Sequence, residues 1–184
     1  MYTLFIDTHL WDIIIILLKD GKVVNKEEVI NKKNNSEYIF PSIIKVIDKV
    51  KLDEIIVVNG PGSFTGVRLG VTIAKTLAYT LNIPIKSISA LEVMSITSDN
   101  DKVAFSDNNG YYLANFANKD NPEYKYITEE EFDLKKDKEE YLTKYENDIE
   151  KVYEFIKNRK SLNPHEVNPI YIKKIGVEID KKSD

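Results

Sequence analysis

The feature that most constrains this chain is a glycine-rich stretch directly after a short apolar run. Residues 60–70 read Gly-Pro-Gly-Ser-Phe-Thr-Gly-Val-Arg-Leu-Gly, hold four of the chain's seven glycines, and follow Ile55-Ile56-Val57-Val58-Asn59. An apolar run, a glycine-rich turn and a helical pattern in this order predict a strand, a tight turn and a helix start. At such a turn the backbone can approach a phosphate or another segment closely.

The remainder of the first half predicts alternating elements around this turn. Three strands of an antiparallel meander, with a hairpin turn at Asp20-Gly21, come first, and helices and strands then alternate. The expected strands are 3–7, 11–19, 22–30, 52–59 and 85–89, and the expected helices are 34–50, 65–81 and 90–96. This order differs from the βαβ start of a dinucleotide-binding fold. It is the order of the ribonuclease-H-like lobe of actin, hexokinase and Hsp70 relatives, which defines the α/β ASKHA fold.

The second half has weaker patterns and is expected to form a reduced second lobe. They predict a hairpin at 103–116, a strand at 123–128, a capping box from Thr128 to Glu131, a helix at 149–157 and a short strand or extended arm at 169–174. We therefore expect two domains. Residues 1–97 would form the complete first lobe with the partner-binding helices, and residues 98–184 the second lobe with a C-terminal helix and arm.

Composition argues against several classes of function. With 26 basic and 30 acidic residues the net charge is −4, unlike a free nucleic-acid-binding domain. Cysteine is absent, and the two histidines, His9 and His165, form no metal-binding motif, so no metal site is predicted. Residues 1–7 do not resemble a signal peptide, and the apolar run 13–18 is too short to span a membrane. A cytoplasmic protein is expected.

The glycine-rich turn and the first strand also form a candidate phosphate site. Asp7 ends the first strand, where nucleotide-dependent relatives of this fold orient Mg²⁺-bound water, although an N-cap or turn acceptor is the favoured interpretation of a single acid. Arg68 lies in the first helical turn, where a cation opposes the helix dipole, so it faces either an anion or solvent. No Gly-Lys-Ser/Thr follows, so the turn is not a P-loop. The candidate nucleotide residues are Asp7, Thr8, Gly60, Gly62, Ser63, Thr65 and Arg68.

The turn, together with Ala74-Lys75 and Leu77-Ala78 after it, resembles the signature of the TsaB family. This family supplies non-catalytic subunits for bacterial threonylcarbamoyladenosine synthesis on tRNA. Phe5-Ile6-Asp7-Thr8, Ile88-Ser89-Ala90-Leu91-Glu92 and Pro169-Ile170-Tyr171-Ile172-Lys173 resemble further family segments in the same order. His9 departs from the family's usual serine, Asn35 from its usual histidine, and residues 107–112 from its second-lobe motif.

The resemblance implies a scaffold or activator without catalytic residues of its own and without a cofactor. Such a subunit binds the catalytic subunit TsaD, is joined by the ATPase TsaE, forms a homodimer when alone, and meets tRNA only through the complex, away from membranes. TsaD then transfers a threonylcarbamoyl group to the adenosine next to the anticodon. The helix at 65–81 would carry the partner interface, with residues Gly66, Val67, Gly70, Val71, Ala74, Lys75 and Ala78. The alternative is a small ASKHA-fold ATPase or kinase that binds Mg-ATP with Asp7 and the Gly60–Gly70 loop.

Overall fold

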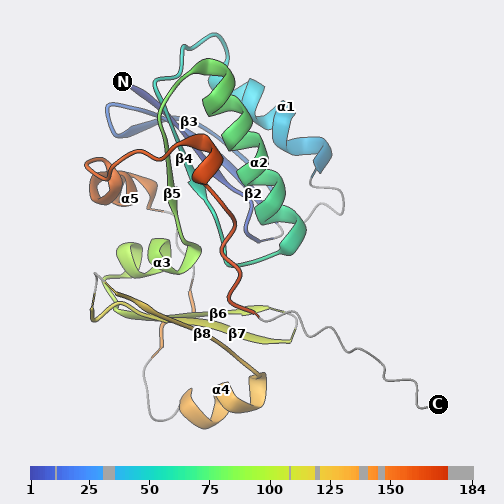
Figure 1. The fold of residues 1–184 in the computed structure, drawn as a ribbon, viewed down its shortest axis with the longest axis vertical. Coiled ribbons are helices and arrows are strands. Elements are labelled where there is room, and N and C mark those ends of the chain that lie inside the picture. The colour runs from blue at the N-terminus through green and yellow to red at the C-terminus, as the bar shows by residue number, and fades with distance from the viewer. Residues whose placement is uncertain are drawn as a thin grey trace, which may run out of the picture.

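One mixed five-stranded sheet organises most of the first half of the chain, and we call the part of the molecule around it the first lobe (Figure 1). The computed structural model describes residues 1–10, 12–30, 36–107, 109–118, 121–136, 141–144 and 148–173. The strands are β1 (Tyr2–Asp7), β2 (Ile13–Lys19), β3 (Lys22–Val29), β4 (Glu54–Val58) and β5 (Ile85–Ile88), in the order β3-β2-β1-β4-β5. β1 pairs antiparallel with β2 and parallel with β4, so the predicted meander and crossover are confirmed.

Helices cover both faces of this sheet because its central strands are apolar on both sides. Leu4 and Ile6 face α1 (Ser36–Ile47) and α2 (Phe64–Leu81). Phe5 points the other way, into a core shared with α3 (Ala90–Ser98) and α5 (Ile149–Ile156). Figure 1 shows α1 and α2 side by side, with α5 across the sheet from them. Positions 11, 34 and 35 of the predicted elements lie outside the described residues.

A buried ion pair lies under α5. Glu54 on β4 and Lys86 on the neighbouring parallel strand β5 are 4% and 5% exposed, and their charged groups are 2.5 Å apart. Lys86 Nζ also donates to the carbonyl oxygen of Lys157, the C-cap of α5, at 2.7 Å. A cation is favourable at this end of a helix. The pair therefore fixes the end of α5 to the sheet.

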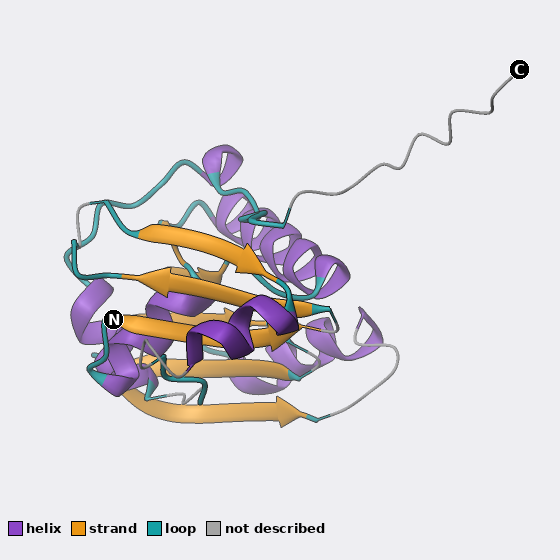
Figure 2. Ribbon diagram, turned by 90° about the horizontal axis from the view of Figure 1, so that it is seen from below, coloured by secondary structure: helices purple, strands orange, loops and turns teal. Residues whose placement is uncertain are grey.

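A three-stranded antiparallel sheet is formed by β6 (Lys102–Asp107), β7 (Gly110–Asn115) and β8 (Glu123–Ile127), and we call the part of the molecule around it the second lobe. One face contributes to the core that contains α3 and α5, and the other packs on α4 (Glu129–Lys136). The capping box at the start of α4 is confirmed, since the Thr128 amide donates to Glu131 and the Glu131 amide donates to Thr128 Oγ1. Figure 2, from below, shows helices on both sides of the strands.

The C-terminal segment returns to the first lobe. A short 3₁₀ helix, η1 (Pro164–Glu166), packs on α2, and residues 167–173 then run along α2 toward the second sheet as an extended arm (Figure 1). The described part of the predicted strand or arm is therefore an arm, and position 174 lies outside the described residues. Val167 is 1% exposed within the core of the first lobe. The division into domains at residue 97 stays a prediction.

Candidate functional site

The glycine-rich turn joins the end of β4 to the start of α2, as the sequence predicts. Ser63 is the N-cap of α2, and its hydroxyl accepts from the Gly66 amide at 3.4 Å. Gly60 has a φ of +100°, a left-handed conformation that favours glycine, and its carbonyl accepts from the Ala90 amide at 2.8 Å. The turn thus links β4, α2 and α3.

The turn after β1 lies directly against this glycine-rich segment. The Ser63 amide donates to the His9 carbonyl at 2.7 Å, and Thr8 Oγ1 donates to the Gly66 carbonyl at 2.7 Å. A Cβ on Gly62 would lie 2.1 Å from the His9 carbonyl oxygen, and one on Gly66 would lie 2.2 Å from that of Thr8. The glycines therefore allow two backbone segments of the same chain to touch.

Asp7 and His9 form a buried pair beside this contact. His9 Nδ1 lies 2.6 Å from Asp7 Oδ1, and the same carboxylate oxygen accepts from the His9 amide at 3.1 Å. Both residues are 1% exposed. The acid that ends β1 is thus held by its own neighbour two residues on, which matches the turn-acceptor interpretation of Asp7.

A cavity of about 400 Å³ lies between the two lobes beside this pair. Its walls come from the turn after β1, the start of α2, the hairpin between β6 and β7, and the C-terminal arm. The lining residues are His9, Leu10, Gly62, Ser63, Phe64, Thr65, Phe105, Ser106, Asp107, Asn109, Tyr112 and Lys173.

Two lining residues of this inter-lobe cavity, Asp107 and Lys173, form a polar cluster with Tyr126 on β8. Tyr126 donates to Asp107 Oδ1 at 2.7 Å, and Lys173 Nζ lies 3.2 Å from Asp107 Oδ2 and 3.1 Å from the Tyr126 hydroxyl. Burial raises the pKa of Asp107, but hydrogen bonds from Tyr126, the Asn109 amide and Lys173 outweigh it and leave this pKa below its ordinary value. Hydrogen bonds to Tyr126 and Asp107 raise the pKa of Lys173.

These opposite pKa shifts predict how the stability depends on pH. The stability from the Asp107 carboxylate is complete above its unfolded pKa of about 3.9 and is lost as pH falls through its lower folded pKa. The stability from Lys173 is present below its unfolded pKa of about 10.4 and is lost as pH rises through its higher folded pKa. The stability difference between the wild type and Asp107→Asn should therefore be constant from about pH 5 to 9 and shrink below about pH 4.

Thermal unfolding at intervals between pH 3 and 9 measures this difference. Asp101→Asn, at an exposed aspartate just before β6, is the matched control. A difference for Asp107→Asn that keeps its full size down to pH 3 contradicts the prediction.

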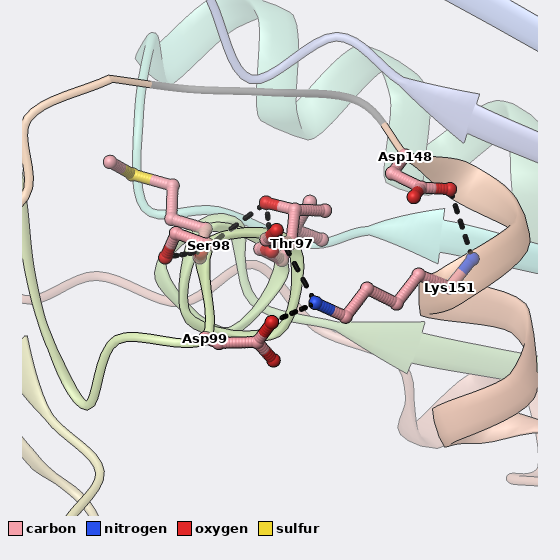
Figure 3. Close-up of polar contacts among 7 residues, drawn as sticks. Thr97, Ser98, Asp99, Asp148 and Lys151 are labelled. Atoms are coloured by element: carbon pink, nitrogen blue, oxygen red, sulfur yellow. Dashed lines mark hydrogen bonds and ion pairs between the residues drawn. The ribbon is translucent and has the colours of Figure 1, made fainter.

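A second hollow, of about 410 Å³, lies between α3, α5 and the second sheet. Lys151 on α5 reaches Asp99, the C-cap of α3, at 2.6 Å and the Thr97 carbonyl at 3.5 Å (Figure 3). Asp148 caps the start of α5 by accepting from the Lys151 amide. The charged groups at this hollow join two helices of the core.

Most residues of the predicted partner interface are buried inside the protein. Six of the seven are buried against the sheet of their own chain, and Lys75 is partly buried with its Nζ 3.3 Å from the His165 carbonyl. The buried six are Gly66, Val67, Gly70, Val71, Ala74 and Ala78. These six residues are not accessible to another protein in this structure. An interface on α2 stays a prediction, and it would have to form on the exposed face of the helix.

The candidate nucleotide residues gather at the glycine-rich turn, but most already contact the chain itself. Thr65 and Arg68 are exposed, and the Arg68 guanidinium lies 4.8 Å from the centre of the Phe64 ring. Within the described residues no three histidine or acidic side chains come together to hold a metal ion. In the same part of the chain no helix is long and apolar enough to cross a membrane.

Two features of the site could not be read from single motifs. The sequence marks His9 only as a departure from a family pattern, whereas the structure pairs it with Asp7. Lys173 and Tyr126 come from segments far apart in the chain and meet Asp107 through the tertiary fold. For the cluster of Asp107, Tyr126 and Lys173, the only sequence signal is an acid followed by turn-forming residues at 107–110.

The chain is similar in sequence to proteins of threonylcarbamoyladenosine synthesis on tRNA. The family model described as TsaD, tRNA N6-adenosine threonylcarbamoyltransferase, matches residues 30–105. The TsaB protein of Bacillus subtilis is 40% identical over 100 residues, which cover 52% of this chain and 44% of that protein. TsaB of Buchnera aphidicola from Acyrthosiphon pisum is 35% identical over 69 residues, covering 35% and 31%. The matches span less than half the length of these relatives.

Two solved structures from Pseudomonas aeruginosa share the whole fold. A protein described as similar to the peptidase YEAZ has a TM-score of 0.75 at 14% identity and covers 94% of this chain and 99% of its own. The structure titled YeaZ has a TM-score of 0.69 at 16% identity, covering 92% and 99%. These findings confirm the ASKHA-type fold and the resemblance to the TsaB family.

Proposed function

Because the chain resembles TsaB, we propose that it is a non-catalytic subunit for threonylcarbamoylation of tRNA, acting through a TsaD-like catalytic partner. The observation that carries this proposal is the 40% identity to a TsaB protein over 100 residues. A TsaE-like ATPase would join the pair, and tRNA would be reached through the complex. The chain would act by favouring the competent state of its partner, which requires that it bind this state more tightly than others.

The contacts of the glycine-rich turn support a structural role. The carbonyl of Gly66 and the amide of Ser63 bond to the turn after β1, and the Asp7 carboxylate bonds to His9. An enzyme that used this turn as a phosphate site would need backbone amides such as that of Ser63, and this acid, to face its ligand. Their use within the chain favours a scaffold over the ATPase or kinase alternative.

The exposed face of α1 and α2 is the surface proposed for the partner. Phe40 and Ile44, one turn apart on α1, are 52% and 50% exposed. On α2, Thr72, Thr76 and Thr80 are exposed at four-residue spacing on the side away from the sheet. Exposed apolar side chains on α1 and small polar ones on the adjacent helix α2 suit a helix-to-helix interface, since burial of the apolar area drives association.

Replacing Phe40 and Ile44 by aspartate should weaken the complex with a TsaD-like protein at least about tenfold, because two charges would enter an apolar contact. The fold should persist, as both side chains are about half exposed. Leu134→Asp, on α4 and 75% exposed, is the matched control and should leave binding unchanged. Titration by calorimetry measures the affinity, and a reconstituted reaction with TsaD-like and TsaE-like proteins and tRNA measures the activity.

Two results would contradict the proposal. One is a reconstituted reaction that proceeds equally well with and without this chain. The other is micromolar binding of Mg-ATP by the chain alone, which would favour the ATPase or kinase alternative. Equal affinity of the Phe40/Ile44 variant and the wild type would remove only the assignment of this surface.

A further inference from the structure

The C-terminal arm is anchored in the first lobe at its start. Val167 lies in the core between the sheet and α2. Asn59, at the end of β4, binds the arm twice: its Nδ2 donates to the Asn168 carbonyl at 3.0 Å, and its carbonyl accepts from the Ile170 amide at 2.8 Å. The arm is thereby attached to the strand that leads into the glycine-rich turn.

The far end of the arm is attached to the second lobe. Ile172 packs against the core that the two lobes share. Lys173 bonds to Asp107 on β6 and to Tyr126 on β8, and its Nζ lies 4.6 Å from the centre of the Tyr126 ring. Between the two ends, the exposed ring of Tyr171 lies 5.7 Å from the ring of Phe64 at the start of α2. Seven residues therefore connect both lobes along one side of the inter-lobe cavity.

We propose that residues 167–173 form a strap across the inter-lobe cavity, and that Lys173, held by Asp107 and Tyr126, is the latch that controls access to this cavity. Lys173 and Asp107 both line the cavity, one from the strap and one from the second sheet. When their contact opens, the end of the strap separates from the second sheet and the cavity widens on this side. The shared core around α3 and α5 keeps the lobes together.

The latch has the properties of a contact that opens without global unfolding. The side chains of Lys173 and Asp107 are 38% and 24% exposed, and partly exposed ion pairs contribute little to total stability. By contrast, Val167 at the other end is fully buried, so the strap remains attached to the first lobe. Local opening at such a site costs less than unfolding of the core. This inference rests on the contacts of the arm alone and not on the proposed function.

Two measurements on Lys173→Met test the latch. Hydrogen exchange follows the Ile170 amide, which the strap holds against Asn59. The rate of thiol labelling follows a Leu10→Cys probe on the cavity wall, in a chain with no other cysteine. Loss of the latch should raise the labelling rate about tenfold, because the open state becomes more populated. The Ile170 amide should keep its wild-type exchange rate, because this end of the strap stays attached to the first lobe. Lys173→Arg keeps the charge and should stay near the wild type.

The control is Lys125→Met, the same change at an exposed lysine on β8 whose carboxylate partner Glu123 lies 3.7 Å away. It should leave both rates unchanged. Asp107→Asn and Lys173→Met break the same contact, so their combined effect should be smaller than the sum of the two. The proposal is overturned if Lys173→Met leaves the labelling rate at the wild-type value, or if Lys125→Met raises it equally.

Discussion

Gly66→Ala should abolish stable folding or lower the free energy of unfolding by more than about 3 kcal/mol, since overpacking against an immobile neighbour has costs of this order. The added Cβ would lie 2.2 Å from the Thr8 carbonyl oxygen, an atom of the backbone. β1 would have to move away from α2 to admit it. Alanine otherwise favours a helix by about 1 kcal/mol, so the clash must outweigh a gain. Urea unfolding measures the difference.

Gly70→Ala is the informative comparison, because its Cβ would meet the Thr8 side chain instead, with Oγ1 at 2.2 Å. Adding Thr8→Ala should therefore rescue much of the loss in Gly70→Ala and none of the loss in Gly66→Ala. Thr8→Ala alone should cost about 1 kcal/mol for its hydrogen bond to Gly66. A Gly66→Ala protein as stable as the wild type contradicts the close contact between these segments.

Lys86→Met should lower the free energy of unfolding by about 3–5 kcal/mol, the usual cost of leaving one partner of a buried ion pair without its counter-charge. The Glu54 carboxylate would stay 4% exposed beside an apolar side chain, and the Lys157 carbonyl at the end of α5 would lose its donor. Chemical unfolding followed by circular dichroism measures the change.

A variant that replaces both Glu54 and Lys86 distinguishes the cost of an uncompensated buried charge from the cost of lost packing. Glu54→Leu with Lys86→Met should be much less destabilised than Lys86→Met alone, because no uncompensated charge is then buried. Lys45→Met, which removes a lysine of an exposed pair with Glu27, should cost no more than about 1 kcal/mol. A double variant that loses as much stability as the sum of its single variants contradicts a pair that acts as one unit.

The fold could be predicted because local patterns and connection order agree. The Asp20-Gly21 turn sets the β2–β3 hairpin, since both residues adopt positive φ. The capping box at Thr128 sets the start of α4. The sequence patterns do not predict η1, which is only three residues long and lies between the expected helix at 149–157 and the expected strand or arm at 169–174. Pro41 lies inside α1, although a proline fits a helix only near its first turn or at a kink.

The site was harder to predict because an apolar stripe on a helix can either pack on the core of its own chain or bind a partner. Val67, Val71 and Ala74 recur at the spacing of a buried face, and the same spacing suits a face that binds a partner. Only the position of the sheet decides that they are core. Likewise, the distance between β1 and α2 cannot be read from the sequence, yet it determines whether the glycines admit a phosphate or the turn at Thr8.

The place of Val167 in the chain has a consequence for synthesis on the ribosome. Proteins of this size often fold in parts as the chain emerges, the N-terminal part first. Here the core under α2 includes a residue that is made only after all three strands of the second sheet. Part of the apolar surface under α2 therefore stays uncovered until the arm has left the exit tunnel.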